Sequence, residues 1–279
     1  MSLPEPKSIK AIARLFSTNR LLDPERDWLA RAQYVERPFR RLLNGQSVPY
    51  SSRYYDQLSL HLLYRSLHQA NEACNKLWTT IELYKHAKED ELLCNQFSFN
   101  FLGSSSIPTL HYANCSALIS LMSLFGVGSF VTRTPTLEFF NVIRTANEFA
   151  LNRRDDYLRS LLGHRPRGWH WQVLETYRGL REHGVEMPMV DIESCRTLLI
   201  ARNRCHYDVL GHTTMREVFG FEEYFGFLPT VIASVSKAID SLCEVLGTLP
   251  NHCDKRFQAL RIVIPHLFAL FQRRFISEV

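Results

Sequence analysis

The sequence predicts an all-α protein, a helical bundle with at most one short β-hairpin. Along most of the chain, apolar residues recur three and four positions apart, which is the spacing of a helix that buries one face. The alternation typical of strands occurs only in residues 97–103 and 128–134, and two short strands do not build a sheet-based fold. With 46% hydrophobic and 22% charged residues, the 279-residue chain has the composition of a globular protein.

The helical pattern covers the chain in several segments. Residues 50–93 keep the spacing long enough for one helix or two, and residues 228–245 show it most clearly, with Ser and Lys on the opposite side. Proline ends or kinks a helix, and we expect this at Pro38 and Pro265. Further helices are predicted at residues 8–16, 24–43, 109–125, 136–162, 170–182, 191–208 and 255–274.

A domain boundary is predicted in the segment FLGSSSIP, residues 101–108. Its glycine, three serines and proline interrupt the helical pattern and are typical of a loop. The division is then a helical N-terminal region at 1–103 and a second helical domain at 104–279; the alternative is a single domain with one core.

The cysteines and the termini indicate a cytoplasmic protein that does not contact membranes. Seven cysteines are odd in number and widely spaced, without a C-x-x-C motif, which disfavours a disulfide framework and a zinc finger. The N-terminus has no apolar segment of a secretory signal, and the run at 262–271 is too short to cross a bilayer. A net charge of +5 permits an anionic partner without requiring one.

Motifs for metal or cofactor binding are absent from the sequence. GVGSF at 126–130 lacks the third glycine and the Lys-Ser/Thr of a phosphate loop, so it is interpreted as a turn. There is no H-E-x-x-H, and the adjacent carboxylates in NRRDDYLR at 152–159 do not face the same way on a helix. We therefore expect no metal and no cofactor.

A basic and aromatic segment, GHRPRGWHW, lies at 163–171. Arg165, Arg167 and Trp169 together predict a loop that binds single-stranded nucleic acid, because arginine holds phosphate and tryptophan stacks on bases. The alternative is a connecting loop whose tryptophans anchor it to the core.

The helix predicted at 191–208 has one face that is apolar in its first part and polar in its last part. Asp191 caps its start, and an apolar stripe follows that turns polar on the same face. The apolar members are Ile192, Cys195 and Leu199, and the polar members are Arg202, Asn203 and His206. Polar groups on a buried face must be paired or used, so these three residues are the candidate site. Arg204 and Asp208 fall on the other side, where an ion pair is expected.

Arginine and histidine four residues apart suit the chemistry of a phosphodiester. The guanidinium can hold the phosphate charge, and an imidazole, which titrates near neutral pH, can transfer a proton. In RNA the neighbouring 2′-hydroxyl is a built-in nucleophile, so that cleavage requires no metal.

The stretch RNRCHYD, residues 202–208, resembles the R-N-x(3 to 5)-H signature of the HEPN superfamily, whose members are often metal-independent ribonucleases of toxin–antitoxin, CRISPR and phage-defence systems. The match covers Arg202, Asn203 and His206, and Tyr207 follows the histidine as it often does there. Three residues separate Arg202 from His206, where four to six are common. The resemblance implies that the domain at 104–279 is HEPN-like and forms a dimer with facing motifs, in which Arg202 and His206 act on the phosphate and Asn203 orients the histidine.

Two functions are predicted. The first is a metal-independent HEPN-type endoribonuclease that acts in bacterial defence or in a toxin–antitoxin pair. Its partner is RNA, and its oligomeric state is a homodimer or a subunit of a larger assembly. The second is a non-catalytic, helical HEPN-like interaction or scaffold subunit of a larger complex. Arg202 then forms a buried or interfacial salt bridge, for instance with Glu175 or Glu148, and His206 is hydrogen-bonded in the core or at an interface. The predicted nucleic-acid contacts are Arg165, Arg167, Trp169, Arg204 and Tyr207.

Overall fold

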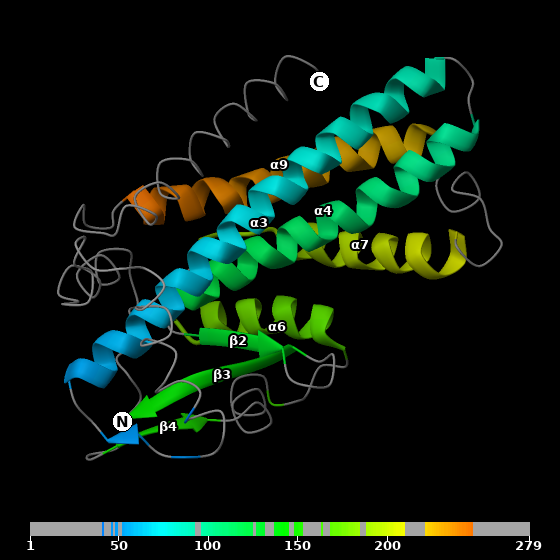
Figure 1. Ribbon diagram of the computed structural model, residues 1–279. Coiled ribbons are helices and arrows are strands. Elements are labelled where there is room, and N and C mark those ends of the chain that lie inside the picture. Colours follow the sequence, from blue (N-terminus) through cyan, green and yellow to red (C-terminus); the bar gives the residue numbers. More distant parts are fainter. Residues whose placement is uncertain are drawn as a thin grey trace. The chain divides into compact units, whose positions relative to one another are not determined.

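The computed structural model describes residues 41, 46, 48–49, 52–92, 96–124, 127–131, 137–144, 148–152, 163, 168–184, 188–209 and 221–247. Helices account for most of these residues (Figure 1), which confirms the helical class predicted from the sequence. In chain order the elements are β1 (Val48–Pro49), α3 (Ser52–Leu92), α4 (Gln96–Leu124), β2 (Val127–Val131), β3 (Leu137–Arg144), β4 (Glu148–Asn152), α6 (Trp169–Glu182), α7 (Ile192–Asn203), the π-helical turn η1 (Arg204–Val209) and α9 (Phe221–Gly247).

The described elements belong to two compact units, each built from separate stretches of the chain. The helical unit contains α3 from Ala70 onward, α4 as far as Ala117, then α7, η1 and α9 as far as Ser241. The sheet unit contains β1, the start of α3, the end of α4, the strands β2 to β4 and α6.

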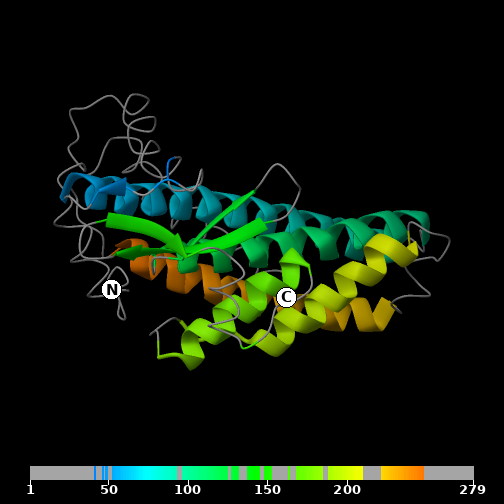
Figure 2. The same ribbon diagram turned by 90° about the horizontal axis from the view of Figure 1, so that it is seen from below.

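In the helical unit α3 and α9 bury one apolar face each, as the spacing of their residues predicts, whereas α4 is buried nearly all round from Leu110 to Ala117. The core of this unit includes Ala73, Leu77 and Ile81 of α3, Ile107, Leu110 and Ala113 of α4, Leu198 and Leu199 of α7, and Leu228, Ile232 and Val235 of α9. Figure 2 shows α7 and α9 beside α4 from below. A hydrogen bond of 2.8 Å between the hydroxyls of Ser106 and Tyr224 joins α4 to α9.

The sheet unit holds a small antiparallel sheet with the strand order β1-β4-β3-β2. This sheet has more strands than the single hairpin expected. Within the same unit, α3 and α4 are joined by reciprocal serine contacts: Ser66 Oγ donates to the carbonyl oxygen of Ser120 at 2.9 Å, and Ser120 Oγ donates to that of Ser66 at 2.7 Å.

The strand predicted at 97–103 and the loop predicted at 101–108 are both wrong, because α4 runs through them without a break. Serine and threonine hydroxyls bond to carbonyls within the helix, as Ser104 does to Phe101 at 3.0 Å and Thr109 to Ser105 at 2.7 Å. Gly103 is buried. Packing thus overrides the low helix propensity of this stretch, and the boundary predicted at residue 103 does not coincide with a loop.

The helix predicted at 136–162 is also wrong where the structure describes it, since β3 and β4 lie there. Apolar runs of this length fit a buried strand or a helix equally well, and here pairing with β2 settles the choice. The strand expected at 128–134 corresponds to β2, and the helices expected at 50–93, 109–125, 170–182 and 228–245 to α3, α4, α6 and α9.

The helices predicted at 8–16 and 255–274, and Pro38 and Pro265, lie outside the described residues, as does nearly all of 24–43. None of the described helices carries an apolar stretch long enough to span a bilayer. The cysteines whose side chains the structure describes are buried and form no disulfide: Cys74, Cys115, Cys195 and Cys205.

Candidate functional site

Helix α7 begins where the sequence predicts, but it ends at Asn203 and not at residue 208, so that Arg202 lies in its last turn. The side chain of Asp191 caps the helix by accepting from the amides of Glu193 and Ser194, both at 3.1 Å. Hydrogen bonds from Ser194 lower the pKa of the Asp191 carboxyl. A carboxylate at this end also complements the helix dipole, so the cap stabilises the helix that carries the candidate site.

The chain does not continue from Arg202 as an α-helix. From Arg204 to Val209 it forms the π-helical turn η1, in which hydrogen bonds join residues five apart instead of four. The side chain that approaches Arg202 is therefore at position 207, and His206 is exposed. The expectation that Arg202 and His206 share a face assumed α-helical geometry, which the structure does not have here.

The side chain of Arg202 is buried and is held by two tyrosine rings and two hydrogen bonds. It is only 6% exposed, and its Cζ lies 5.7 Å from the ring centroid of Tyr112 and 5.8 Å from that of Tyr207, within the range of cation–π attraction. Its Nη1 donates to Asn203 Oδ1 at 3.0 Å and its Nη2 to the Tyr112 hydroxyl at 2.9 Å. We call Tyr112, Arg202, Asn203 and Tyr207 the Arg202 cluster.

The guanidinium of Arg202 is charged, and hydrogen bonds to described residues do not use all of its N–H donors. Burial lowers the pKa of Arg202, but the hydroxyls of Tyr112 and Tyr207 outweigh this effect, so that the pKa is raised. Within the described part of the chain no carboxylate forms an ion pair with Arg202, and its buried Nε has no hydrogen-bond partner. A guanidinium has five N–H donors, and two are used by Tyr112 and Asn203.

The predicted salt bridges of Arg202 are not observed among the described residues. Glu175 is ion-paired with Arg178, which also approaches Glu182 at 3.6 Å. The side chain of Glu148, in β4, lies outside the described residues.

The aromatic residue after the histidine is more closely tied to Arg202 than the histidine is. Tyr207 is 67% exposed, and the His206 ring lies edge-on to it, with centroids 5.7 Å apart and planes at 86°. Arg204 is exposed as well. The side chain of Asp208 is outside the description, so its expected ion pair with Arg204 stays a prediction.

The basic segment at 163–171 is described only in part. Arg165 and Arg167 lie outside the described residues. Trp169 is the first residue of α6, and its ring is stacked on that of His170 at 3.7 Å between centroids. The nucleic-acid contact predicted for these three residues stays a prediction.

Sequence reasoning missed Tyr112, which reaches Arg202 from α4, 90 positions away. Its surroundings in the sequence, LHYANCSAL, mix apolar residues with small polar ones and a histidine. A tyrosine in such a helix needs a partner for its hydroxyl, and this is the signal that could have marked it.

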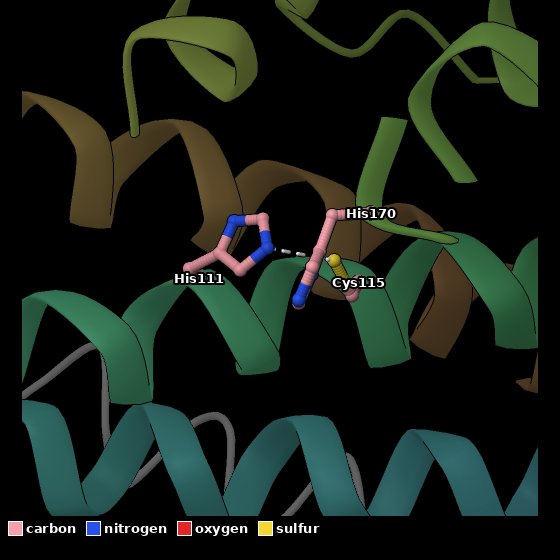
Figure 3. Close-up of side chains that lie close together, drawn as sticks. All are labelled: His111, Cys115 and His170. Carbon is pink, nitrogen blue, oxygen red and sulfur yellow. Dashed lines mark hydrogen bonds between the residues drawn. The ribbon is translucent and has the colours of Figure 1, made fainter. Parts of the chain in front are cut away.

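Two metal-ligand types lie next to each other on α4. Cys115 Sγ is 3.4 Å from His111 Nε2, one helical turn away (Figure 3). Cysteine and histidine are ligand types of tetrahedral zinc sites, but such a structural site needs four ligands and this pair provides two. Burial raises the pKa of the Cys115 thiol, so that it is not activated as a nucleophile.

The chemistry that fits the Arg202 cluster is anion binding. A buried, charged arginine without a carboxylate partner among the described residues can hold a phosphate, and the exposed His206 lies edge-on to the Tyr207 ring of the same cluster. No protein-family model, curated protein or solved structure matches the chain.

Proposed function

We propose that the protein is an endoribonuclease of HEPN type that cleaves RNA without a metal ion, with the Arg202 cluster as its phosphate site. The observation that carries the proposal is the guanidinium of Arg202. It is 6% exposed, charged, and without a carboxylate partner among the described residues. A buried charge is costly unless it is paired, and a phosphate of the substrate supplies the pairing.

The reaction follows from the groups present. Arg202 binds the non-bridging oxygens of the scissile phosphate, and this stabilises the charge that grows in the transition state. His206 takes the proton of the 2′-hydroxyl, the 2′-oxygen forms a bond to phosphorus, and the bond to the 5′-oxygen breaks. The leaving oxygen is protonated by His206 of a second copy, so the active state is a homodimer. The products are a 2′,3′-cyclic phosphate and a 5′-hydroxyl.

The rings and the amide of the cluster orient Arg202. Tyr112 and Asn203 each accept one N–H of the guanidinium, which fixes its plane. An arginine held in this way loses less conformational entropy when it binds phosphate. Asn203 thus acts on the arginine, where the family resemblance implied an action on the histidine.

A second function, a non-catalytic interaction subunit, is favoured by a different observation. Ile200 and Tyr207 on α7 and η1 are 48% and 67% exposed, and exposed apolar residues mark contact surfaces when they are contiguous. Under this function, loss of Ile200 changes the assembly of the protein and RNA is irrelevant.

The test is cleavage of single-stranded RNA in EDTA by the wild type and by His206→Ala. The proposal predicts cleavage by the wild type and a loss of at least about a hundredfold in the variant, the usual scale of general acid–base catalysis. His86→Ala is the matched control, because His86 is an exposed histidine on α3 and its loss leaves the rate unchanged.

Cleavage by His206→Ala at the wild-type rate contradicts the proposal, as does wild-type protein that cleaves no RNA. Light scattering of Ile200→Asp, beside the wild type, decides the second function. A changed oligomeric state together with inactive wild-type protein supports the interaction subunit.

A further inference from the structure

The π-helical turn brings the ring of Tyr207, and not that of His206, over the guanidinium of Arg202. In an α-helix position 206 would follow position 202 on the same face, four residues on. In η1, Tyr207 lies over the guanidinium of Arg202, with 5.8 Å from Cζ to the ring centroid. π-helical turns are rare and frequently occur at functional sites. The turn thus presents the ring of Tyr207 at this position.

The ring of Tyr207 is both exposed and held in place. It is 67% exposed, although an aromatic ring gains free energy by burial. Arg202 contacts it on one side, and the His206 ring meets it edge-on at 5.7 Å. A ring that is fixed by two neighbours and open to solvent is a surface on which a planar group can stack.

A second and independent observation points to a ligand at the same place. The Nε of Arg202 is buried and has no hydrogen-bond partner within the described residues, and the side chain is 6% exposed. The guanidinium that lies against the exposed ring therefore has an N–H donor that no described residue satisfies. An anionic group joined to a planar aromatic one, as in a nucleotide, engages both.

We infer that Tyr207 is the base-stacking residue of this site and that the substrate is single-stranded RNA, held by one phosphate on Arg202 and one base on Tyr207. The inference rests on the proposed function. A single strand is required because the bases of a duplex are already stacked on each other, whereas unpaired bases can be splayed onto aromatic side chains. Stacking discriminates little between bases. The site therefore distinguishes single strands from duplexes more strongly than it distinguishes one base sequence from another.

Binding of RNA that cannot be cleaved tests the inference separately from catalysis. The probes are fluorescein-labelled oligo(U) and oligo(A) with fluorine in place of each 2′-hydroxyl, and their anisotropy is measured with the wild type, Tyr207→Leu and Tyr207→Phe. Loss of one base–aromatic stack predicts a dissociation constant about 5 to 150 times larger for Tyr207→Leu. Tyr207→Phe keeps the ring and binds within about threefold of the wild type.

Phe101→Leu is the matched control, because Phe101 is another exposed aromatic residue, 63% exposed, in the same unit. It leaves the dissociation constant unchanged. Annealing the probes to each other removes the difference between the wild type and Tyr207→Leu, since paired bases are unable to reach the ring.

Equal binding of single strands by the wild type and Tyr207→Leu overturns the inference, and the proposed ribonuclease can still stand. Equal weakening by Tyr207→Leu and Tyr207→Phe also overturns it, because the hydroxyl and not the ring would then matter. Wild-type protein that binds neither probe removes the proposed function and the inference together. Wild-type protein that binds but never cleaves natural RNA removes the nuclease alone.

Discussion

Arg202 carries a full charge where water is nearly excluded, and its partners explain how. Two tyrosine rings with their hydroxyls and an asparagine amide oxygen surround the guanidinium. No carboxylate of the described residues joins them, so within this part of the chain the charge is solvated by dipoles without being neutralised. Such an arrangement stabilises the folded chain less than a salt bridge or an apolar side chain of the same volume does. We interpret this cost as the mark of a binding residue.

Replacing Arg202 with methionine should separate stability from function. The apolar stem keeps most of the volume and removes an uncompensated buried charge, so the free energy of unfolding in urea changes by less than about 1 kcal/mol or rises. RNA binding, measured by fluorescence anisotropy, weakens at least tenfold, because a charge-assisted hydrogen bond to phosphate contributes about 1.5–3 kcal/mol.

Arg196→Met is the control on the same helix, where Arg196 pairs with the exposed Glu193 at 2.9 Å. This variant should bind RNA as the wild type does. A loss of several kcal/mol of stability in Arg202→Met, with RNA binding unchanged, would show that Arg202 serves the fold alone.

The helices show which parts of the structure the sequence could predict. The apolar positions of α9, such as Leu228, Ile232 and Val235, are buried as their spacing indicates, and Asp191 caps α7 as expected. The phenylalanine alternation before Gly103 suggested a strand, but a buried glycine and hydroxyl contacts such as Ser106–Tyr224 hold that stretch in α4. These contacts are tertiary, so local propensity could not reveal them.

The candidate site could be predicted only in part, because some of its contacts are also tertiary. Arg202 and Asn203 were found because they interrupt an apolar face of one helix. Tyr112 was missed because it comes from another helix. The exposure of His206 depends on the π-helical turn, which leaves no periodic signal in a stretch of six residues.

The cap of α7 gives a prediction for the helix as a whole. Asp191→Ala removes the acceptor for two backbone amides and should lower the free energy of unfolding by about 1 kcal/mol, with a smaller loss for Asp191→Asn. Because the pKa of Asp191 is lowered in the folded state, its contribution is present above the carboxyl's unfolded pKa and is lost as the pH falls through the folded one.

Urea unfolding at pH 7 and at pH 3 measures this effect. The difference between the wild type and Asp191→Ala should shrink at pH 3. A difference that is the same at both pH values would show that the carboxylate does not provide the cap.

The chain divides into two compact units whose segments alternate along the sequence, and both α3 and α4 contribute residues to each unit. The helical unit buries thiols along with its aliphatic core. Burial raises the pKa of Cys74 and of Cys195 to about 12, from an ordinary value of 9.0. The folded protein therefore keeps these protons at a pH where the unfolded chain has lost them.

This difference makes the stability of the molecule sensitive to alkaline pH. The contribution of each thiol is fully present below about pH 9 and is lost as the pH rises from 9 toward 12, at up to about 1.4 kcal/mol per pH unit. Urea unfolding at pH 8, 9 and 10 should give a shallower decline for Cys195→Ala than for the wild type. Equal declines would mean that Cys195 ionises as readily in the folded protein as in the unfolded one.

The chemical ends of the RNA product test the central claim most directly, because they record which oxygen attacked the phosphorus. The wild type is incubated in EDTA with a single-stranded RNA, and the fragments are analysed by mass spectrometry beside the same RNA carrying one 2′-deoxy nucleotide at the cleaved position. The proposed reaction of Arg202 and His206 predicts 2′,3′-cyclic phosphate and 5′-hydroxyl ends, and no cleavage at the deoxy nucleotide. Fragments with 3′-hydroxyl and 5′-phosphate ends, or cleavage at the deoxy position, would contradict it.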